Sequence, residues 1–179
     1  MSDDVDVQRT NVSDEMQAAV GTEISRRVSF PVSESDIRRW AVAVYYPEPP
    51  PLRFIDAGAA AASAAGGIVA PEDFNPFAWV VAETHGAEMS GGAANNPDMF
   101  EQALGISGPG LPNILNGGIE IEYGVPIRPG DIITSVTALD GYRERPGSLG
   151  LMLFTMMRTV WTNQDGQTVK SVRGTTIRY

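Results

Sequence analysis

The side chains that could perform acid–base or metal chemistry are few in this chain. Its 179 residues include no cysteine and one histidine, His85. The lack of cysteine excludes disulfides, thiolate metal sites and a cysteine nucleophile within the chain. One histidine also excludes a metal site built from several histidines. A mechanism that needs an imidazole must therefore use His85 or take a histidine from another chain.

The remaining acid–base candidates lie near a helix that the sequence predicts to end at about residue 84. Glu83 and Asp73 are the carboxylates nearest this helix, and His85 follows its expected end. A cation at a helix C-terminus interacts favourably with the helix dipole, which explains His85 without catalysis. A solvated acid at the helix end explains Glu83 equally well. Asp56 has a sufficient role as the N-cap of an earlier helix.

Helices are predicted throughout the first half of the chain. Residues 13–20 indicate a short helix, and residues 22–31 an extended segment. Ser33 followed by Asp36 is typical of a capping box at the start of a longer helix. Pro47 ends that helix, because the residue before a proline is pushed away from α geometry.

A stiff elbow follows. Residues Tyr45–Leu52 read YYPEPPPL, and their four prolines favour an extended connector. Asp56 is the expected N-cap of the small-residue helix AGAAAASAA, which Gly66–Gly67 ends. Pro71 or Pro76 then begins the next helix, which the sheet is expected to wrap.

The second half of the chain has β-type patterns. A region rich in Gly, Asn and Pro at about residues 86–113 predicts a long loop. Four strand-like runs follow, at residues 119–123, 132–139, 149–161 and 169–177. Helices followed by antiparallel strands predict an α+β fold. We expect a single domain over residues 13–179, preceded by a flexible acidic tail at residues 1–12.

Three segments carry a family resemblance. They are the elbow with the GGIVAP sequence at Gly66–Pro71, the sequence LNGGIEIEYGVPIRPGD at Leu115–Asp131, and the final hairpin WTNQDGQTVKSVRGTTIRY. In this order and spacing they resemble the MaoC-like acyl dehydratase and enoyl hydratase family, in its FAS1-like, N-terminal branch. The resemblance covers roughly residues 21 to 179. It implies the hot-dog fold, in which a curved antiparallel sheet wraps a long central helix.

The resemblance also implies a chemistry. Family members add water to an acyl thioester, or remove it, with an aspartate and a histidine on the elbow as the general acid–base pair. A backbone N–H at the start of the central helix polarises the thioester carbonyl. On this chain the aspartate position falls on Tyr46 and the histidine position near Leu52. A tyrosine hydroxyl is a poor base at neutral pH and leucine transfers no proton, so we expect no catalytic residue in this chain.

The resemblance suggests substrate-binding positions instead. These are Tyr46, Gly66, Gly67, Pro71, Phe74, Asn116, Gly117 and Gly118. A structural role explains several of them as well. Gly66, Gly67 and Pro71 could simply end one helix and begin the next, and Asn116–Gly118 could form a strand bulge.

The expected partner is a MaoC-like catalytic subunit that carries the Asp and His, in a heterodimer or heterotetramer. The expected substrate is an acyl-CoA or acyl-carrier-protein thioester, with no cofactor and no metal. A net charge of −9 argues against nucleic acid and anionic membranes as partners. The start of the chain has no secretory signal and no apolar run approaches a membrane span, so a cytoplasmic location is expected. Two alternatives stay open: a homodimeric acyl-binding protein without turnover, and a thioesterase that uses Glu83.

Overall fold

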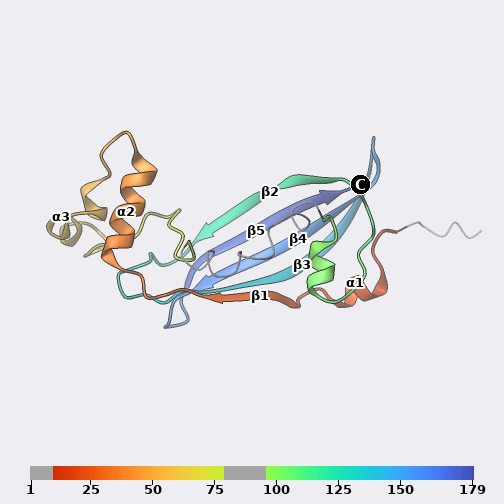
Figure 1. Cartoon of the computed structure of the whole chain (residues 1–179), viewed down its shortest axis with the longest axis horizontal. Helices are drawn as coiled ribbons and strands as arrows, with labels where there is room; N and C mark the ends of the chain where they lie inside the picture. Colours follow the sequence, from red (N-terminus) through yellow and green to blue (C-terminus); the bar gives the residue numbers. More distant parts are fainter. Residues whose placement is uncertain (1–9, 79–95) are drawn as a thin grey trace, which may run out of the picture.

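The computed structural model describes residues 10–78 and 96–179. Its main element is a curved, five-stranded antiparallel sheet with the strand order β1-β3-β4-β5-β2 (Figure 1). The strands are β1 (Glu23–Val28), β2 (Ile114–Tyr123), β3 (Thr134–Gly147), β4 (Gly150–Thr162) and β5 (Thr168–Arg178). The fold class predicted from the sequence is confirmed. All four predicted strands of the second half are present: β4 has the predicted length of 13 residues and the other three are longer.

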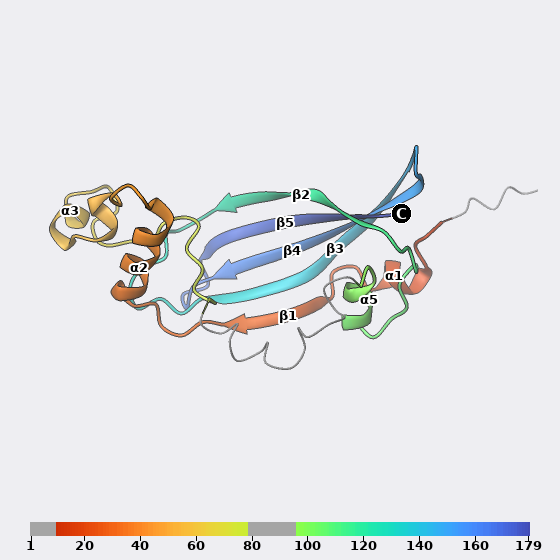
Figure 2. The same cartoon turned by 45° about the horizontal axis from the view of Figure 1, so that its top comes forward.

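The helices gather at the two ends of the sheet. Helices α2 (Glu34–Tyr45) and α3 (Ala57–Ala61), with the 3-10 turn η1 (Leu52–Phe54), lie beyond one end of the strands (Figure 1). Helices α1 (Asp14–Ala18) and α5 (Met99–Ala103) lie at the opposite end, next to the C-terminus (Figure 2).

Local sequence signals explain several of these elements. The capping box at the start of α2 is formed: the Asp36 N–H donates to Ser33 Oγ at 3.1 Å, and the Ser33 N–H donates to Asp36 Oδ2 at 3.4 Å. Asp56 caps α3 as predicted, because its carboxylate accepts the Ala59 N–H at 2.7 Å. The turn between β4 and β5 closes with the Gly166 N–H donating to the Asn163 carbonyl.

The predicted start of the central helix is wrong within residues 71–78, which form turns. Asn75 explains this, because its side-chain oxygen accepts the Phe77 N–H at 3.0 Å. Such a local bond competes with helical hydrogen bonding, and Pro76 cannot donate to a helix. The remainder of the predicted helix, with Glu83 and His85, lies outside the described residues.

Three other expectations need correction. The region at about residues 86–113 is not wholly loop, because its described part contains α5. The predicted tail is anchored at its last residues: the Asn11 N–H and the Thr10 hydroxyl both donate to the Glu144 carboxylate, at 2.6 and 2.7 Å. Helix α3 is also shorter than the predicted segment 57–65.

The principal core lies where α2 and the chain after α3 pack on one end of the sheet. Trp40 of α2 meets Phe74 edge to face at 5.6 Å, and Phe77 meets Trp161 of β4 at 5.1 Å. The buried members are Val32, Ile37, Ala60, Ile68, Ala70, Phe74, Phe77, Ile127, Ile133 and Val169. This core fixes the elbow relative to the strands.

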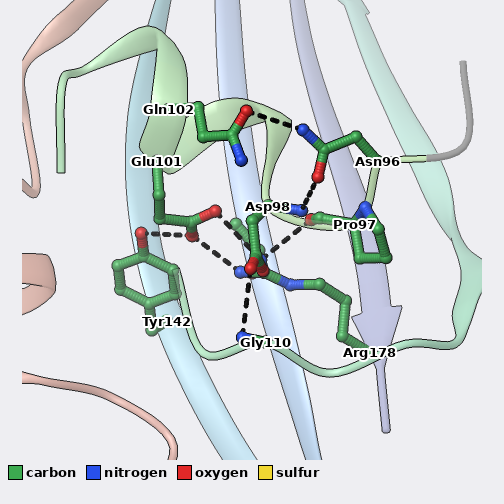
Figure 3. Close-up of polar contacts among 9 residues, drawn as sticks. Asn96, Pro97, Asp98, Glu101, Gln102, Gly110, Tyr142 and Arg178 are labelled. Atoms are coloured by element: carbon green, nitrogen blue, oxygen red, sulfur yellow. Dashed lines mark hydrogen bonds and ion pairs between the residues drawn. The ribbon is translucent and has the colours of Figure 1, made fainter. Parts of the chain in front are cut away.

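A buried ion pair holds α5 against the sheet at the other end (Figure 3). Arg178 of β5 and Glu101 of α5 are both 0% exposed, and the guanidinium donates to the two carboxylate oxygens at 2.9 and 2.7 Å. Arg178 also donates to Asp98 at 3.0 Å and to Thr155 at 2.7 Å. The Tyr142 hydroxyl donates to Glu101 at 2.7 Å. A bidentate pair with these further partners compensates the cost of burying both charges.

The same contacts set the protonation of Glu101. Burial alone would raise the pKa of its carboxyl, but the hydrogen bonds from Arg178 and Tyr142 and the Arg178 charge outweigh burial. The pKa therefore lies below its ordinary value. A depressed carboxyl pKa contributes stability that is complete above the unfolded-state pKa and is lost as the pH falls through the folded-state pKa.

We predict that Glu101→Gln destabilises the fold. The substitution removes the bidentate carboxylate and leaves Asp98 as the remaining counter-ion of the buried Arg178, so the free energy of unfolding at about pH 7 should fall by about 3 kcal/mol. Urea unfolding at about pH 7 and about pH 3 checks this. The native chain should lose more stability in acid than the variant, because only the native chain has the depressed carboxyl.

Tyr142→Phe is the matched control. It removes one hydrogen bond to the same carboxylate but keeps the ion pair, so it should cost only about 1 kcal/mol and keep most of the acid dependence. If Glu101→Gln matched the native chain in stability and acid dependence, the ion pair would not hold α5 in place.

Candidate functional site

The elbow closes on itself through aromatic contacts. Helix α2 ends at Tyr45, and a cis Tyr46–Pro47 bond follows. The Tyr45 ring centroid lies 6.0 Å from that of Phe54, and the Arg53 guanidinium lies 4.6 Å from the Phe54 ring centroid. Buried Ala41, Phe54 and Val69 form a small core beneath the elbow. The elbow is therefore a packed unit and not a free loop.

The chain after α3 brings Pro71 to the end of β2. Gly66 has a φ of +66°, a conformation that favours glycine, and it turns the chain back. Arg128 holds this turn by donating to the Ala65 carbonyl at 2.7 Å. The Ala70 N–H then donates to the Ile127 carbonyl at 2.8 Å. Pro71 thus lies beside the segment that follows Tyr123.

A groove runs between the elbow and this end of the sheet. Its volume is about 560 Å³, within the range of small-molecule sites. Its lining residues are Val44, Tyr45, Arg53, Phe54, Val69, Ala70, Pro71, Glu72, Asp73, Tyr123 and Pro126. A pocket of about 80 Å³ adjoins it and shares five of these residues, from Ala70 to Glu72 together with Tyr123 and Pro126. This pocket ends at Lys170.

Lys170 is the most unusual charged group of the site. It is the only lysine among the 13 basic residues of the chain, and it is 7% exposed. Its ammonium lies 4.5 Å from the Trp161 ring centroid and 5.3 Å from that of Tyr123. Burial lowers the pKa of Lys170, while the carboxylates of Asp73 and Glu72 act in the opposite direction.

The predicted substrate-binding residues near the elbow separate into three groups. Pro71 lines both the groove and the pocket. Phe74 is 2% exposed and belongs to the core, and Tyr46 is 81% exposed at the end of α2. Gly66 and Gly67 form the turn before Pro71 and do not line the groove. The groove therefore contains Tyr45 in the place that the sequence suggested for Tyr46.

The other predicted residues, Asn116 to Gly118, lie far from the groove. They form a bulge in β2, where the Gly118 N–H donates to Asn116 Oδ1 at 2.8 Å and Gly118 has a φ of +114°. The groove meets β2 at Tyr123, roughly 20 Å further along the strand. The structure gives these three residues a backbone role and does not bring them to Pro71.

The described part of the groove contains no aspartate–histidine pair. Its carboxylates are Glu72 and Asp73, and its basic groups are Arg53 and the neighbouring Lys170. Leu52, at the expected histidine position, is 62% exposed. Within residues 10–78 and 96–179 no cluster of His, Asp and Glu could hold a metal ion, and no helix is long and apolar enough to span a membrane.

Sequence reasoning missed Lys170, Tyr123 and Arg53. A signal for Lys170 was present, because a single lysine occurs among arginines in an otherwise ordinary strand pattern. Its burial, however, comes from Tyr123 and Trp161, which flank it as direct cross-strand neighbours on β2 and β4. Nothing in the strand pattern of β5 alone indicates that arrangement.

Solved structures share the fold at low sequence identity. The MaoC-like dehydratase from Rhodospirillum rubrum is 22% identical with a TM-score of 0.51, over 90% of this chain and 92% of that one. The ChsH1–ChsH2 complex from Mycobacterium tuberculosis is 19% identical with a TM-score of 0.59, over 92% of this chain and 87% of that one. The HadBC (3R-hydroxyacyl-ACP dehydratase) complex from Mycobacterium tuberculosis is 19% identical with a TM-score of 0.50, over 87% of this chain and 98% of that one. These likenesses show the hot-dog fold.

No curated protein matches the chain by sequence. A family model does: the model described as "FAS1-like, dehydratase domain region" matches residues 18–172. This match spans the elbow, the groove and most of the sheet, and it agrees with the fold of the solved structures. The chain therefore belongs to the FAS1-like dehydratase-domain family of MaoC-like hot-dog proteins.

Proposed function

We propose that this chain is the non-catalytic, substrate-shaping subunit of a heteromeric enoyl-CoA hydratase or 3-hydroxyacyl-thioester dehydratase. The observation that carries the proposal is the elbow. Its two acid–base positions hold Tyr46 and Leu52, which are 81% and 62% exposed, and the described groove beside it has no aspartate–histidine pair. A hydration reaction needs a general acid–base pair on one water, so a second subunit must supply it.

The edge strand β2 supports a partner of this kind. All ten of its residues are exposed, and among the described strands it pairs only with β5. Its exposed apolar residues are Ile114, Leu115, Ile119, Ile121 and Tyr123. A long apolar edge strand is a ready template for pairing with another chain. The opposite edge, β1, is shorter and carries Glu23, Arg26 and Arg27.

The groove supports an acyl thioester as the ligand. One wall is apolar and comes from Val44, Tyr45, Phe54 and Val69, which suits the hydrocarbon part of an acyl group. The other wall ends at Tyr123, the last residue of β2. A subunit paired with β2 would therefore complete the groove and bring its own acid–base pair to the thioester. The names of the ChsH1–ChsH2 and HadBC structures describe complexes of two chains, which agrees with a heteromer.

We predict that the purified chain alone does not hydrate crotonyl-CoA or a longer enoyl-CoA. Together with a MaoC-like chain whose elbow carries Asp-x4-His, it should support hydration, because the acid–base pair alone contributes about 10²–10⁴-fold in rate. The assay follows loss of enoyl absorbance, with the partner alone and a partner lacking the aspartate as controls. Enzyme-like turnover by this chain alone would contradict the proposal.

We also predict that Ile121→Lys weakens assembly with the partner. A charge on the apolar side of the β2 edge should weaken association at least about tenfold, as expected for loss of more than about 1.4 kcal/mol at an interface. Native mass measurement of the mixed subunits checks this, and the matched control is Val28→Lys on the opposite edge, where Val28 is 54% exposed. Equal loss of assembly in both variants would show that β2 is not the interface, and a stable complex of identical chains would favour the homodimeric alternative.

A further inference from the structure

The Lys170 side chain is largely buried, and its ammonium lines the small pocket with no ion pair to a described residue. Lys170 is 7% exposed, and its Nζ makes no ion pair and no hydrogen bond with a described residue. Contact with the faces of Trp161 and Tyr123 recovers part of the lost hydration. It does not replace the hydrogen bonds that the three N–H groups make in water.

The space in front of Lys170 is small. The pocket of about 80 Å³ is lined by Pro71, Tyr123, Val125, Ile127 and Val169 among other residues. Water occupies about 30 Å³ per molecule in the liquid, so this volume suits a group of two or three heavy atoms and excludes a nucleotide. The pocket opens into the larger groove through the shared residues at Pro71 and Tyr123.

The charges around this space are balanced. Lys170 and Glu72 line the small pocket, and Arg53, Glu72 and Asp73 line the adjoining groove, which gives two cations and two carboxylates. A phosphate with two negative charges would be repelled by those carboxylates at short range. An uncharged acceptor oxygen on a largely apolar ligand is not repelled in this way, and it can accept a hydrogen bond from one N–H of the ammonium.

We propose that Lys170 donates a hydrogen bond to an acceptor oxygen of the acyl part of a thioester bound in the groove. This inference rests on the proposed function, and it adds a residue that positions the acyl group and selects for an oxygen at one point along it. The oxygen comes either from the thioester carbonyl or from a carbonyl further along the acyl chain. Both carbonyl oxygens would accept the same hydrogen bond from Lys170, and ligands that carry only one of them distinguish the two cases.

The only lysine of the chain gives a direct readout. Protein made with lysine labelled by carbon-13 at Cε has one lysine signal in its NMR spectrum, from Lys170. Three pantetheine derivatives of equal chain length are added to this protein, alone and in complex with the unlabelled partner. They are hexanoyl-pantetheine, the S-hexyl thioether, and the S-hexyl thioether with a ketone near its far end. Ligand-observed NMR shows independently which of them bind.

An oxygen-bearing ligand should shift the Lys170 signal, and the plain thioether should not. A shift with hexanoyl-pantetheine assigns the oxygen to the thioester carbonyl, and a shift with the keto thioether assigns it to the distal carbonyl. Bound ligands that all shift the signal equally, or that leave it unchanged, would overturn the inference while the proposed function stands. If none of the three bound to the complex, the acyl-thioester proposal would fall as well.

Two variants supply the affinity test. Lys170→Met keeps the apolar stem but has no donor, so it should lose at least about tenfold of the preference for the oxygen-bearing ligand over the plain thioether, as expected for a hydrogen bond from a charged donor. Lys170→Arg keeps the charge and the aromatic contacts and should retain part of that preference. Circular dichroism verifies that each variant folds. An unchanged preference in a folded Lys170→Met protein would contradict the inference. If that variant does not fold, the NMR experiment with labelled Lys170 in the native chain tests the inference by itself.

Discussion

The unpaired edge of β2 is the constraint on which the rest of this molecule depends. A ten-residue strand with exposed apolar side chains presents backbone N–H and C=O groups that only another strand satisfies well. The groove ends on the last residue of that strand, so whatever pairs with β2 also forms a wall of the groove. Under the function that we propose, the elbow without an acid–base pair, the groove and the edge are three parts of one site that a second subunit completes.

Strand β5 connects this site to the opposite end of the sheet. Lys170 and Arg178 lie on the same face of β5, because side chains at even intervals share a face. Arg178 is paired with the Glu101 and Asp98 carboxylates and with Thr155, and it anchors the end of the strand. Lys170 lies against the rings of Tyr123 and Trp161, and no carboxylate of residues 10–78 and 96–179 forms an ion pair with it. This difference between the two cations of β5 is the basis on which we propose a ligand-binding role for Lys170 and a structural role for Arg178.

Much of the fold follows from local signals in the sequence, and the site follows from them only in part. Ser33 with Asp36, Asp56 and the turn at Asn163–Gly166 each act through hydrogen bonds to neighbouring residues, so their types and spacing suffice. Helix α5 depends instead on a contact between residues far apart in the chain, Glu101 with Arg178. The sequence predicted Tyr46 for the groove, but the structure places Tyr45 there. Helix α2 ends at Tyr45, and the position of that end decides which of the two adjacent rings lines the groove.

The replacement of the acid–base pair also changes what the elbow must do. A catalytic elbow has to hold two polar side chains against one water within about 3 Å, which limits the sequence around them. An elbow without that task can be built from prolines and packed by Tyr45, Arg53 and Phe54. Its packing then defines the apolar wall of the groove. Under the function and the Lys170 role that we propose, discrimination between acyl groups would depend on the shape of that wall and on the Lys170 donor. Selection of the substrate and chemistry on the substrate would then be separated onto two subunits that share one edge.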